Sequence, residues 1–128
     1  MKKETVVTEY APKAIGPYSA GIKLDNLVFT AGQLGLDPAT NELAPGGVEA
    51  ETHQALTNVK HVLEAAGSSL AQVLKTTVFL RDMADFPKMN AVYAEFFTEN
   101  FPARSTVQVA ALPKAGAVEI ETIACRVK

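Results

Sequence analysis

Cysteine is almost missing from this chain, and tryptophan is missing altogether. Cysteine occurs once among the 128 residues, at position 125. A single cysteine excludes an internal disulfide and any metal site built on several thiolates. A chain of 128 residues with 48% hydrophobic residues can bury a core without such cross-links. We therefore expect an ordinary globular fold in which Cys125 is a small buried side chain.

A large excess of charge of one sign is also lacking, and so are long apolar runs. Lysine and arginine number 12, aspartate and glutamate number 14, and the formal net charge is −2. The basic residues are scattered, whereas proteins that bind nucleic acid concentrate them. No stretch approaches the roughly 20 apolar residues of a membrane-spanning helix, and the opening MKKETVVTEY has no apolar signal core. We expect no nucleic-acid partner, no membrane partner and a cytoplasmic location.

Clusters of metal ligands and glycine-rich phosphate loops are missing as well. His53 and His61 lie eight residues apart in a helical segment, without a cysteine or carboxylate at ligand spacing. The glycines at 35, 46 and 47 form neither a GxGxxG string nor a P-loop. We expect no metal and no cofactor, and we interpret both histidines as solvated or interface residues.

Turn residues and hydrophobic periodicity divide the chain into eight predicted elements. The predicted strands span residues 5–8, 19–24, 27–30, 73–80, 105–110 and 117–127, and the helices span residues 48–66 and a segment beginning at Asp82 or Asp85. Apolar residues three and four apart, ended by Gly67, indicate the first helix. The second carries an aromatic stripe at helical spacing, typical of a core face: Phe86, Met89, Tyr93, Phe96 and Phe97. Residues 32–47 are rich in glycine and proline and are expected to form a loop.

This order, β-β-β-α-β-α-β-β, predicts an α+β fold with a mixed sheet. No linker, charge block or repeat divides the chain, so we expect residues 1–128 to form a single domain. The opening hairpin and the closing strand pair allow both helices to cover one face of the sheet. The strands at 73–80 and 105–110 would then expose an apolar patch on the other face, which predicts self-association.

The segment PARSTVQVAALPKAGAVEIE, residues 102–121, holds the side chains with the most chemistry. Arg104 carries a charged fork of donors that fits a carboxylate bidentately. In the strand at 117–127 the period of two places Glu119 and Glu121 on one face, and Val118 and Ile120 on the other. A carboxylate on an apolar strand is unfavourable unless it is paired. Two interpretations stay open: an anion clamp beside a carboxylate that orients water, or a set of solvated edge charges.

Six segments of the chain carry a resemblance to a known family. They are GPYS at 16–19, FTAGQ at 29–33, NVKHVLEAAGSSL at 58–70, VLKTTVFLRDMADF at 73–86, NAVYAEFF at 90–97 and PARSTVQVAALPK at 102–114. In this order they resemble the reactive intermediate deaminase (RidA-like) family, formerly called YjgF-like, nearly from end to end. The resemblance implies a chorismate-mutase-like fold and a homotrimer whose three sheets close into a central barrel. It also implies active sites in the clefts between subunits.

Enzymes of that family hydrolyse 2-imino acids, such as 2-iminobutanoate and 2-iminopropanoate, to 2-oxo acids and ammonia. The resemblance places the family's carboxylate-binding arginine at Arg104, its water-associated glutamate at Glu119 and its pocket tyrosine at Tyr18. The expected catalytic residues are Arg104, Glu119 and Tyr18, and the expected substrate-binding residues are Arg104, Gly32, Thr106 and Asn90. Gly32 matches a glycine whose backbone lines the site, and Asn90 matches an asparagine near the subunit cleft.

The chain departs from the family pattern at three positions. Ala31 replaces a common serine, Ala20 replaces a common glutamine, and Thr106 stands where some members carry cysteine. The effect of these three substitutions on substrate preference and on rate stays open. The arginine, the glutamate and the tyrosine are unaffected.

Two other functions compete with the deaminase. The first is a non-catalytic trimer that binds small carboxylates, such as 2-oxo acids, in the same cleft, although an anion-binding site would not favour Glu119 beside its ligand. The second is a ribonuclease or translation inhibitor, as some relatives have been described. The net charge of −2 argues against this function. At the level of single residues, Tyr18 is alternatively a packing aromatic beside Pro17, and Asn90 a helix-surface contact.

Overall fold

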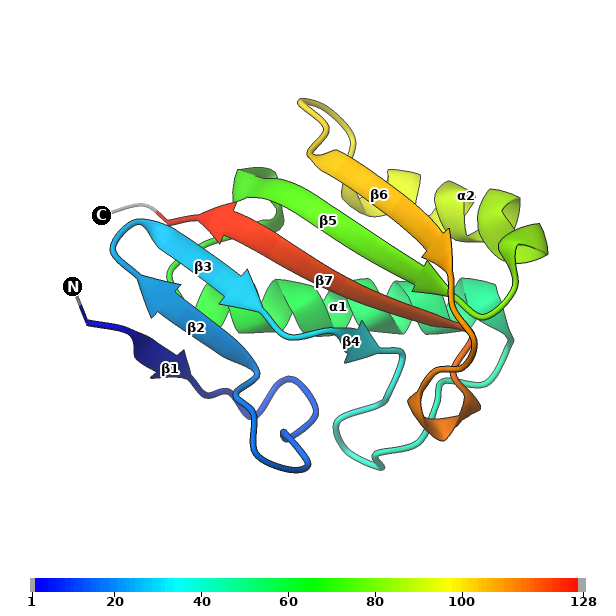
Figure 1. Ribbon diagram of the computed structural model, residues 1–128, viewed down its shortest axis with the longest axis horizontal. Coiled ribbons are helices and arrows are strands. Elements are labelled where there is room, and N and C mark those ends of the chain that lie inside the picture. The colour runs from blue at the N-terminus through cyan, green and yellow to red at the C-terminus, as the bar shows by residue number, and fades with distance from the viewer. Residues whose placement is uncertain (1, 127–128) are drawn as a thin grey trace.

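The computed structural model describes residues 2–126, and its frame is a seven-stranded mixed sheet with two helices (Figure 1). The strands are β1 (Glu4–Val6), β2 (Gly21–Leu24), β3 (Leu27–Thr30), β4 (Gln33–Leu34), β5 (Val73–Leu80), β6 (Ala103–Gln108) and β7 (Val118–Cys125). The helices are α1 (Val48–Ala65) and α2 (Phe86–Phe96), with short 3-10 turns η1 (Leu70–Gln72), η2 (Met83–Asp85) and η3 (Pro113–Ala115).

The strands lie in the order β1-β2-β3-β7-β5-β6, with β4 paired to β7 beyond the end of β3. Neighbouring strands are antiparallel except β5 and β6, which are parallel and joined through α2. Figure 1 shows β1 and β6 at the two edges of the sheet. The predicted α+β fold with a mixed sheet is confirmed.

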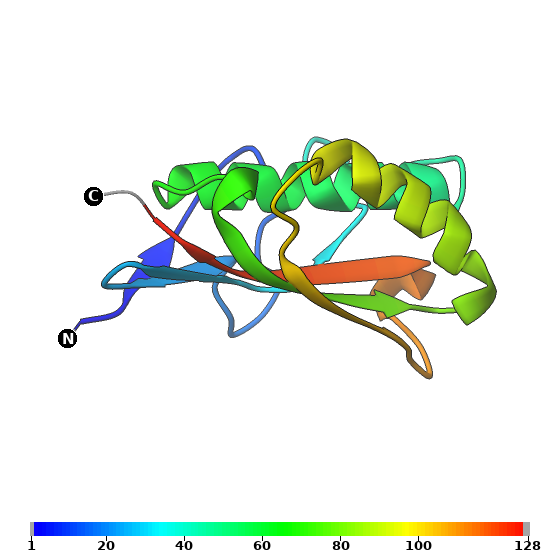
Figure 2. The same ribbon diagram turned by 90° about the horizontal axis from the view of Figure 1, so that it is seen from above.

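Both helices cover the same face of the sheet, as predicted, and the core lies between the two layers (Figure 2). Its fully buried side chains include Leu56, Val59, Val62 and Leu63 from α1, and Val28, Val78 and Ile120 from the strands. The other face of the sheet, which no helix covers, is called the open face below. Along β7 a buried set under the helices alternates with a more exposed set on the open face; the buried set is Val118, Ile120, Thr122 and Ala124. The predicted alternation is therefore confirmed for residues 118–125, while Val127 lies outside the described residues.

The end of α1 follows the predicted signal, whereas the aspartate at the start of α2, Asp85, makes no side-chain capping bond among residues 2–126. Gly67 has a φ of 81°, and the N–H groups of Gly67 and Ser68 donate to the carbonyls of Glu64 (3.1 Å) and Leu63 (2.8 Å). This bonding closes α1 where glycine was expected to stop it. Before α2, the Asp82 carboxylate accepts from the N–H of Ala84 at 2.9 Å and caps η2. Within residues 2–126, no helix has the length and apolarity to cross a membrane.

The expectation of a loop throughout residues 32–47 is wrong at β4. Gln33 and Leu34 pair with Ile120 and Glu119 of β7, and Leu36 forms a further bridge to Leu43. The pairing is stabilised from α1, where the fully buried Asn58 donates to the carbonyls of Leu34 (3.1 Å) and Leu36 (2.8 Å). A strand of two residues has no periodicity to detect, and its stabilising contact comes from a side chain distant in sequence.

Four predicted strands have different ends in the structure, and Cys125 is more exposed than expected. The strands predicted at 5–8, 19–24, 105–110 and 117–127 are Glu4–Val6, Gly21–Leu24, Ala103–Gln108 and Val118–Cys125. β6 begins directly after Pro102, because proline lacks the N–H that a paired residue would donate. Cys125 is half-buried, because it lies on the open face of β7 near the end of the strand.

Candidate active site

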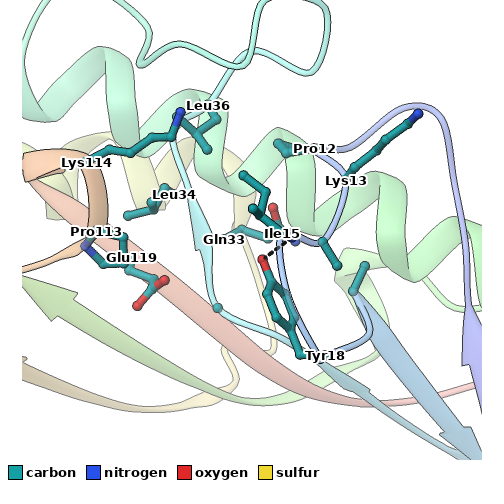
Figure 3. Close-up of a pocket in the computed structure, with 13 residues that line it drawn as sticks. Pro12, Lys13, Ile15, Tyr18, Gln33, Leu34, Leu36, Pro113, Lys114 and Glu119 are labelled. Carbon is teal, nitrogen blue, oxygen red and sulfur yellow. Dashed lines mark hydrogen bonds between the residues drawn. The ribbon is translucent and has the colours of Figure 1, made fainter.

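A pocket of about 340 Å³ lies where the loop before β2, the start of β4, the η3 turn and β7 meet (Figure 3). Its lining includes Ile15, Tyr18, Gly32, Leu34 and Glu119. In Figure 3 the Glu119 carboxylate and the Tyr18 ring project into the same space from different elements. The structure therefore brings together three of the predicted site residues: Glu119, Tyr18 and Gly32.

Glu119 lies against the backbone of Gly32. A Cβ atom at position 32 would lie 2.8 Å from Cδ and 3.1 Å from Oε2 of Glu119, closer than side chains pack. Glycine is thus required for the carboxylate to occupy this place. Partial burial raises the pKa of the Glu119 carboxyl, and the negative charge of Glu121 on the same strand raises it further. A carboxyl whose pKa is raised is better suited to exchanging protons than an ordinary one.

Tyr18 stands at the rim of this pocket with 53% of its surface exposed. Its hydroxyl oxygen accepts a hydrogen bond from the N–H of Ile15 at 3.3 Å, marked by the dashed line in Figure 3. The phenolic O–H has no acceptor within residues 2–126 and can donate to a ligand.

Arg104 lies in a different place, under α2. Its Nη1 donates to Oδ1 of Asn90 at 2.7 Å, and its Cζ lies 4.7 Å from the ring centre of Tyr93 and 5.4 Å from that of Phe86. A second pocket of about 390 Å³ is lined by Arg104, Asn90 and Tyr93, with Phe101 and Pro102. Asn90 thus contacts Arg104 directly.

Thr106 follows Arg104 on the same face of β6, because the two residues lie opposite Thr76 and Val78, both buried under the helices. The Thr106 hydroxyl oxygen is buried and has no hydrogen-bond partner among residues 2–126. A buried hydroxyl in this state is unfavourable until something bonds to it.

Arg104 and Glu119 lie on opposite faces of the sheet. Arg104 pairs with Thr76 of β5, and Glu119 pairs with Phe79 of the same strand. Residues three apart on a strand face opposite sides. Arg104 accordingly packs on α2, while Glu119 faces the side without helices. Within one chain the structure does not unite the predicted clamp with the predicted carboxylate.

For two residues that contact Arg104 the sequence indicates only a place in the core. Phe86 and Tyr93 belong to the aromatic stripe of α2, and Tyr93 is indeed buried. Their spacing with Asn90, at 86, 90 and 93, places all three on one face of a helix. That spacing could have indicated a shared task, but no sequence signal shows that Arg104 packs against this face.

Comparisons with known proteins agree with this fold and with the motifs. The Endoribonuclease L-PSP family model matches residues 8–126. A 2-iminobutanoate/2-iminopropanoate deaminase of Bos taurus is 51% identical over 122 residues, 95% of this chain and 89% of that protein. The crystal structure of the YjgF gene product from Escherichia coli matches with a TM-score of 0.92 and 50% identity, over 97% of this chain and 99% of the other.

The Escherichia coli protein TdcF, solved with bound serine, also has a TM-score of 0.92. It is 45% identical, and the match covers 97% of this chain and 99% of that chain. With a family model that spans nearly all of its residues and relatives at about half identity, this chain belongs to the Endoribonuclease L-PSP family, the YjgF or RidA family that its motifs resemble.

Proposed function

We propose that this protein hydrolyses reactive 2-imino acids, such as 2-iminobutanoate and 2-iminopropanoate, to 2-oxo acids and ammonia. The observation that carries the proposal is the half-buried Glu119 carboxylate, which has a raised pKa and lies in a pocket against Gly32. A site that only held an anionic ligand would gain nothing from the negative charge of Glu119, because the two charges repel each other. The Bos taurus relative, 51% identical to this chain, is named as a deaminase of the same two imino acids, and this similarity supports the proposal.

The active site is formed between two subunits in this proposal. Arg104 of one subunit binds the substrate carboxylate, and the neighbouring subunit supplies its Glu119, Tyr18 and Gly32. The positions of Arg104 and Glu119 on opposite faces of one sheet support this division. The open face also carries apolar side chains that a trimer would cover, among them Phe29, Val107 and Ile123. A homotrimer is therefore part of the proposal.

The proposed reaction needs one water molecule and two side chains, Arg104 and Glu119. Arg104 holds the substrate so that its C=N carbon faces the Glu119 carboxylate, and this orientation lowers the entropic part of the barrier. Glu119 accepts a proton from water as the oxygen forms a bond to the carbon of the protonated imine, and the C=N π electrons move to the nitrogen. It then transfers this proton to the amine nitrogen. The C–N bond breaks as the new hydroxyl group returns its proton to Glu119 and becomes the C=O group, and ammonia and the 2-oxo acid leave.

The remaining predicted residues have supporting roles in this scheme. A backbone carbonyl near Gly32 or Thr106 accepts a hydrogen bond from the imine N–H, a role that needs no particular side chain. Tyr18 donates its phenolic O–H to the substrate at the rim of the pocket. We propose that Asn90 acts through its hydrogen bond to Arg104. No cofactor enters any step.

The alternative functions are less well supported. A binding module for 2-oxo acids would use Arg104 but would be weakened by Glu119. The family name mentions an endoribonuclease, yet 12 basic against 14 acidic residues give no electrostatic attraction to RNA.

A coupled assay tests the proposed function. A pyridoxal-phosphate-dependent dehydratase releases 2-iminobutanoate from threonine, and the purified protein should accelerate the appearance of 2-oxobutanoate. The Arg104→Lys variant is the control, because lysine keeps the charge but loses the bidentate fork, and we expect it to retain only a small part of the acceleration. If wild-type protein leaves the rate unchanged, the deaminase assignment is wrong.

A further inference from the structure

We propose that Tyr93 is a positioning residue for Arg104: its ring, held in place by Thr76, fixes the guanidinium in the orientation that grips the substrate carboxylate. The inference rests on the proposed function, since that function gives Arg104 its ligand. It gives a task to Tyr93, to which neither the family resemblance of the segment NAVYAEFF nor the aromatic stripe of α2 assigns more than a core position.

The guanidinium lies between two aromatic side chains and one amide of α2. Its Cζ is 4.7 Å from the centre of the Tyr93 ring and 5.4 Å from that of Phe86, within the range of a cation–π contact. The third contact is the 2.7 Å hydrogen bond from Nη1 to Oδ1 of Asn90. This bond uses one of the five N–H donors of the fork, and a bidentate grip on a carboxylate needs two others.

The Tyr93 ring is itself immobilised, which suits it to act as a platform. Only 6% of the residue is exposed, its hydroxyl bonds to the Thr76 hydroxyl at 2.8 Å, and Phe97 packs on it with ring centres 4.6 Å apart. Thr76 is the residue of β5 that lies directly opposite Arg104 in the sheet. The ring and the Arg104 backbone are therefore fixed to the same point of the same strand.

A platform of this kind matters because arginine has a long and flexible side chain. A free guanidinium would lose rotational freedom each time it bound a carboxylate, and that loss weakens binding. Stacking on Tyr93 orders the side chain before the ligand arrives. Arg104 contacts the carboxylate in the ground state and in the transition state alike, so the benefit should fall on KM more than on kcat.

The test compares Tyr93→Leu, which removes the ring, with Tyr93→Phe, which keeps the ring and removes the bond to Thr76. We expect Tyr93→Leu to raise KM about tenfold with kcat nearly unchanged, and to weaken inhibition by 2-oxobutanoate by a similar factor. Tyr93→Phe should restore most of the loss. Val92→Ala is the matched control, because it truncates a buried side chain of the same helix, and KM should stay at the wild-type value.

A second pair of measurements keeps the inference testable should Tyr93→Leu fold poorly. Phe86 is only partly buried, so Phe86→Leu should fold and should raise KM in the same direction, by a smaller factor. In the Arg104→Lys background, Tyr93→Leu should have little further effect, because the residue acts through the guanidinium.

The outcomes separate this inference from the proposed function. A wild-type KM in both Tyr93→Leu and Phe86→Leu, with Arg104→Lys still inactive, overturns the positioning role and leaves the deaminase intact. An equal fall of kcat in Tyr93→Leu and Val92→Ala with KM unchanged also overturns it, since that pattern reports packing alone. Full activity in Arg104→Lys removes the carboxylate clamp and with it the proposed use of Arg104.

Discussion

Glu119 is the residue whose chemistry separates an enzyme from a binding protein. If it handles water and protons, Glu119→Gln should depress turnover by about two to four orders of magnitude. Binding of 2-oxobutanoate should stay equal or become tighter, because the amide fills the same space without repelling the anion. Steady-state kinetics and calorimetric titration measure the two effects separately.

Glu121 supplies the internal control for that experiment. It lies on the same face of β7, about 7 Å further along the strand, and it is exposed. Glu121→Gln should leave turnover close to wild type. Should Glu121→Gln be the damaging change and Glu119→Gln silent, the assigned roles of the two glutamates would be exchanged. Two silent variants in an active enzyme would contradict the carboxylate mechanism.

The raised pKa of Glu119 predicts how activity changes with pH. The carboxylate that accepts a proton from water exists only above this pKa, so kcat/KM should fall as the pH is lowered through it. Burial is the larger cause of the rise and the charge of Glu121 the second. Glu121→Gln removes the second cause, which lowers the pKa, and should therefore move the fall in kcat/KM to a lower pH. Identical pH profiles for wild type and Glu121→Gln would contradict this electrostatic account.

At the scale of elements, the parts with their own local signals are the predictable ones. The α1 helix carries its periodicity and its stop at Gly67, and the tight hairpin forms at Asp25 and Asn26, as predicted. The alternation along β7 is a local signal too, and the period of two in its sequence is enough to place Glu119 on the face opposite Val118 and Ile120.

What could not be predicted depends on contacts between residues distant in sequence. β4 is one case, because its pairing is supported by Asn58 from α1. The surroundings of Arg104 are another, because the packing of β6 against α2 brings Tyr93 to it. Gly32 is a third case: its match to the family is visible in the sequence, whereas the reason, contact with the Glu119 side chain, depends on the pairing of β4 with β7.

Asn58 should be a structural requirement for β4 and so for one wall of the Glu119 pocket. Asn58→Ala would leave the carbonyls of Leu34 and Leu36 without their buried donor and Gln54 without its acceptor. We expect the free energy of unfolding to fall by about 2–4 kcal/mol. Denaturant unfolding measures the change.

Thr57→Ala is the matched control on the neighbouring position of α1. Among the described residues, the Thr57 hydroxyl bonds only within the helix, to the carbonyl of His53. Because alanine also favours helix, stability should change by about 0.5 kcal/mol or less. Equal losses in the two variants would mean that the bonds to Leu34 and Leu36 are not what stabilises this region.

At the scale of the whole molecule, the open face of the sheet is the feature that needs a partner. Leu27, Phe29, Val107 and Ile123 lie on it, each between 36% and 42% exposed. Apolar side chains grouped on one face usually mark an interface. We predict a homotrimer at micromolar concentration, to be measured by analytical ultracentrifugation. A stable monomer under those conditions would contradict both the trimer and a site that is shared between subunits.

Hybrid trimers can show whether each active site takes Arg104 from one subunit and Glu119 from the next. Arg104→Lys and Glu119→Gln should each be nearly inactive as homotrimers. When the two variants are mixed in equal amounts, unfolded and refolded together, each hybrid trimer has one interface where an intact Arg104 meets an intact Glu119 of its neighbour. Random assembly should therefore restore about a quarter of the wild-type activity.

The mixture of the same two variants refolded separately is the control, and it should stay inactive as long as subunits do not exchange. If both groups acted within one chain, no subunit of a hybrid would hold a complete pair, and co-refolding would restore nothing. That result would mean that Arg104 and Glu119 meet through a rearrangement of the single chain, against their placement on opposite faces of the sheet. Recovered activity in the co-refolded sample alone can arise only from sites built across an interface, because neither variant carries both groups.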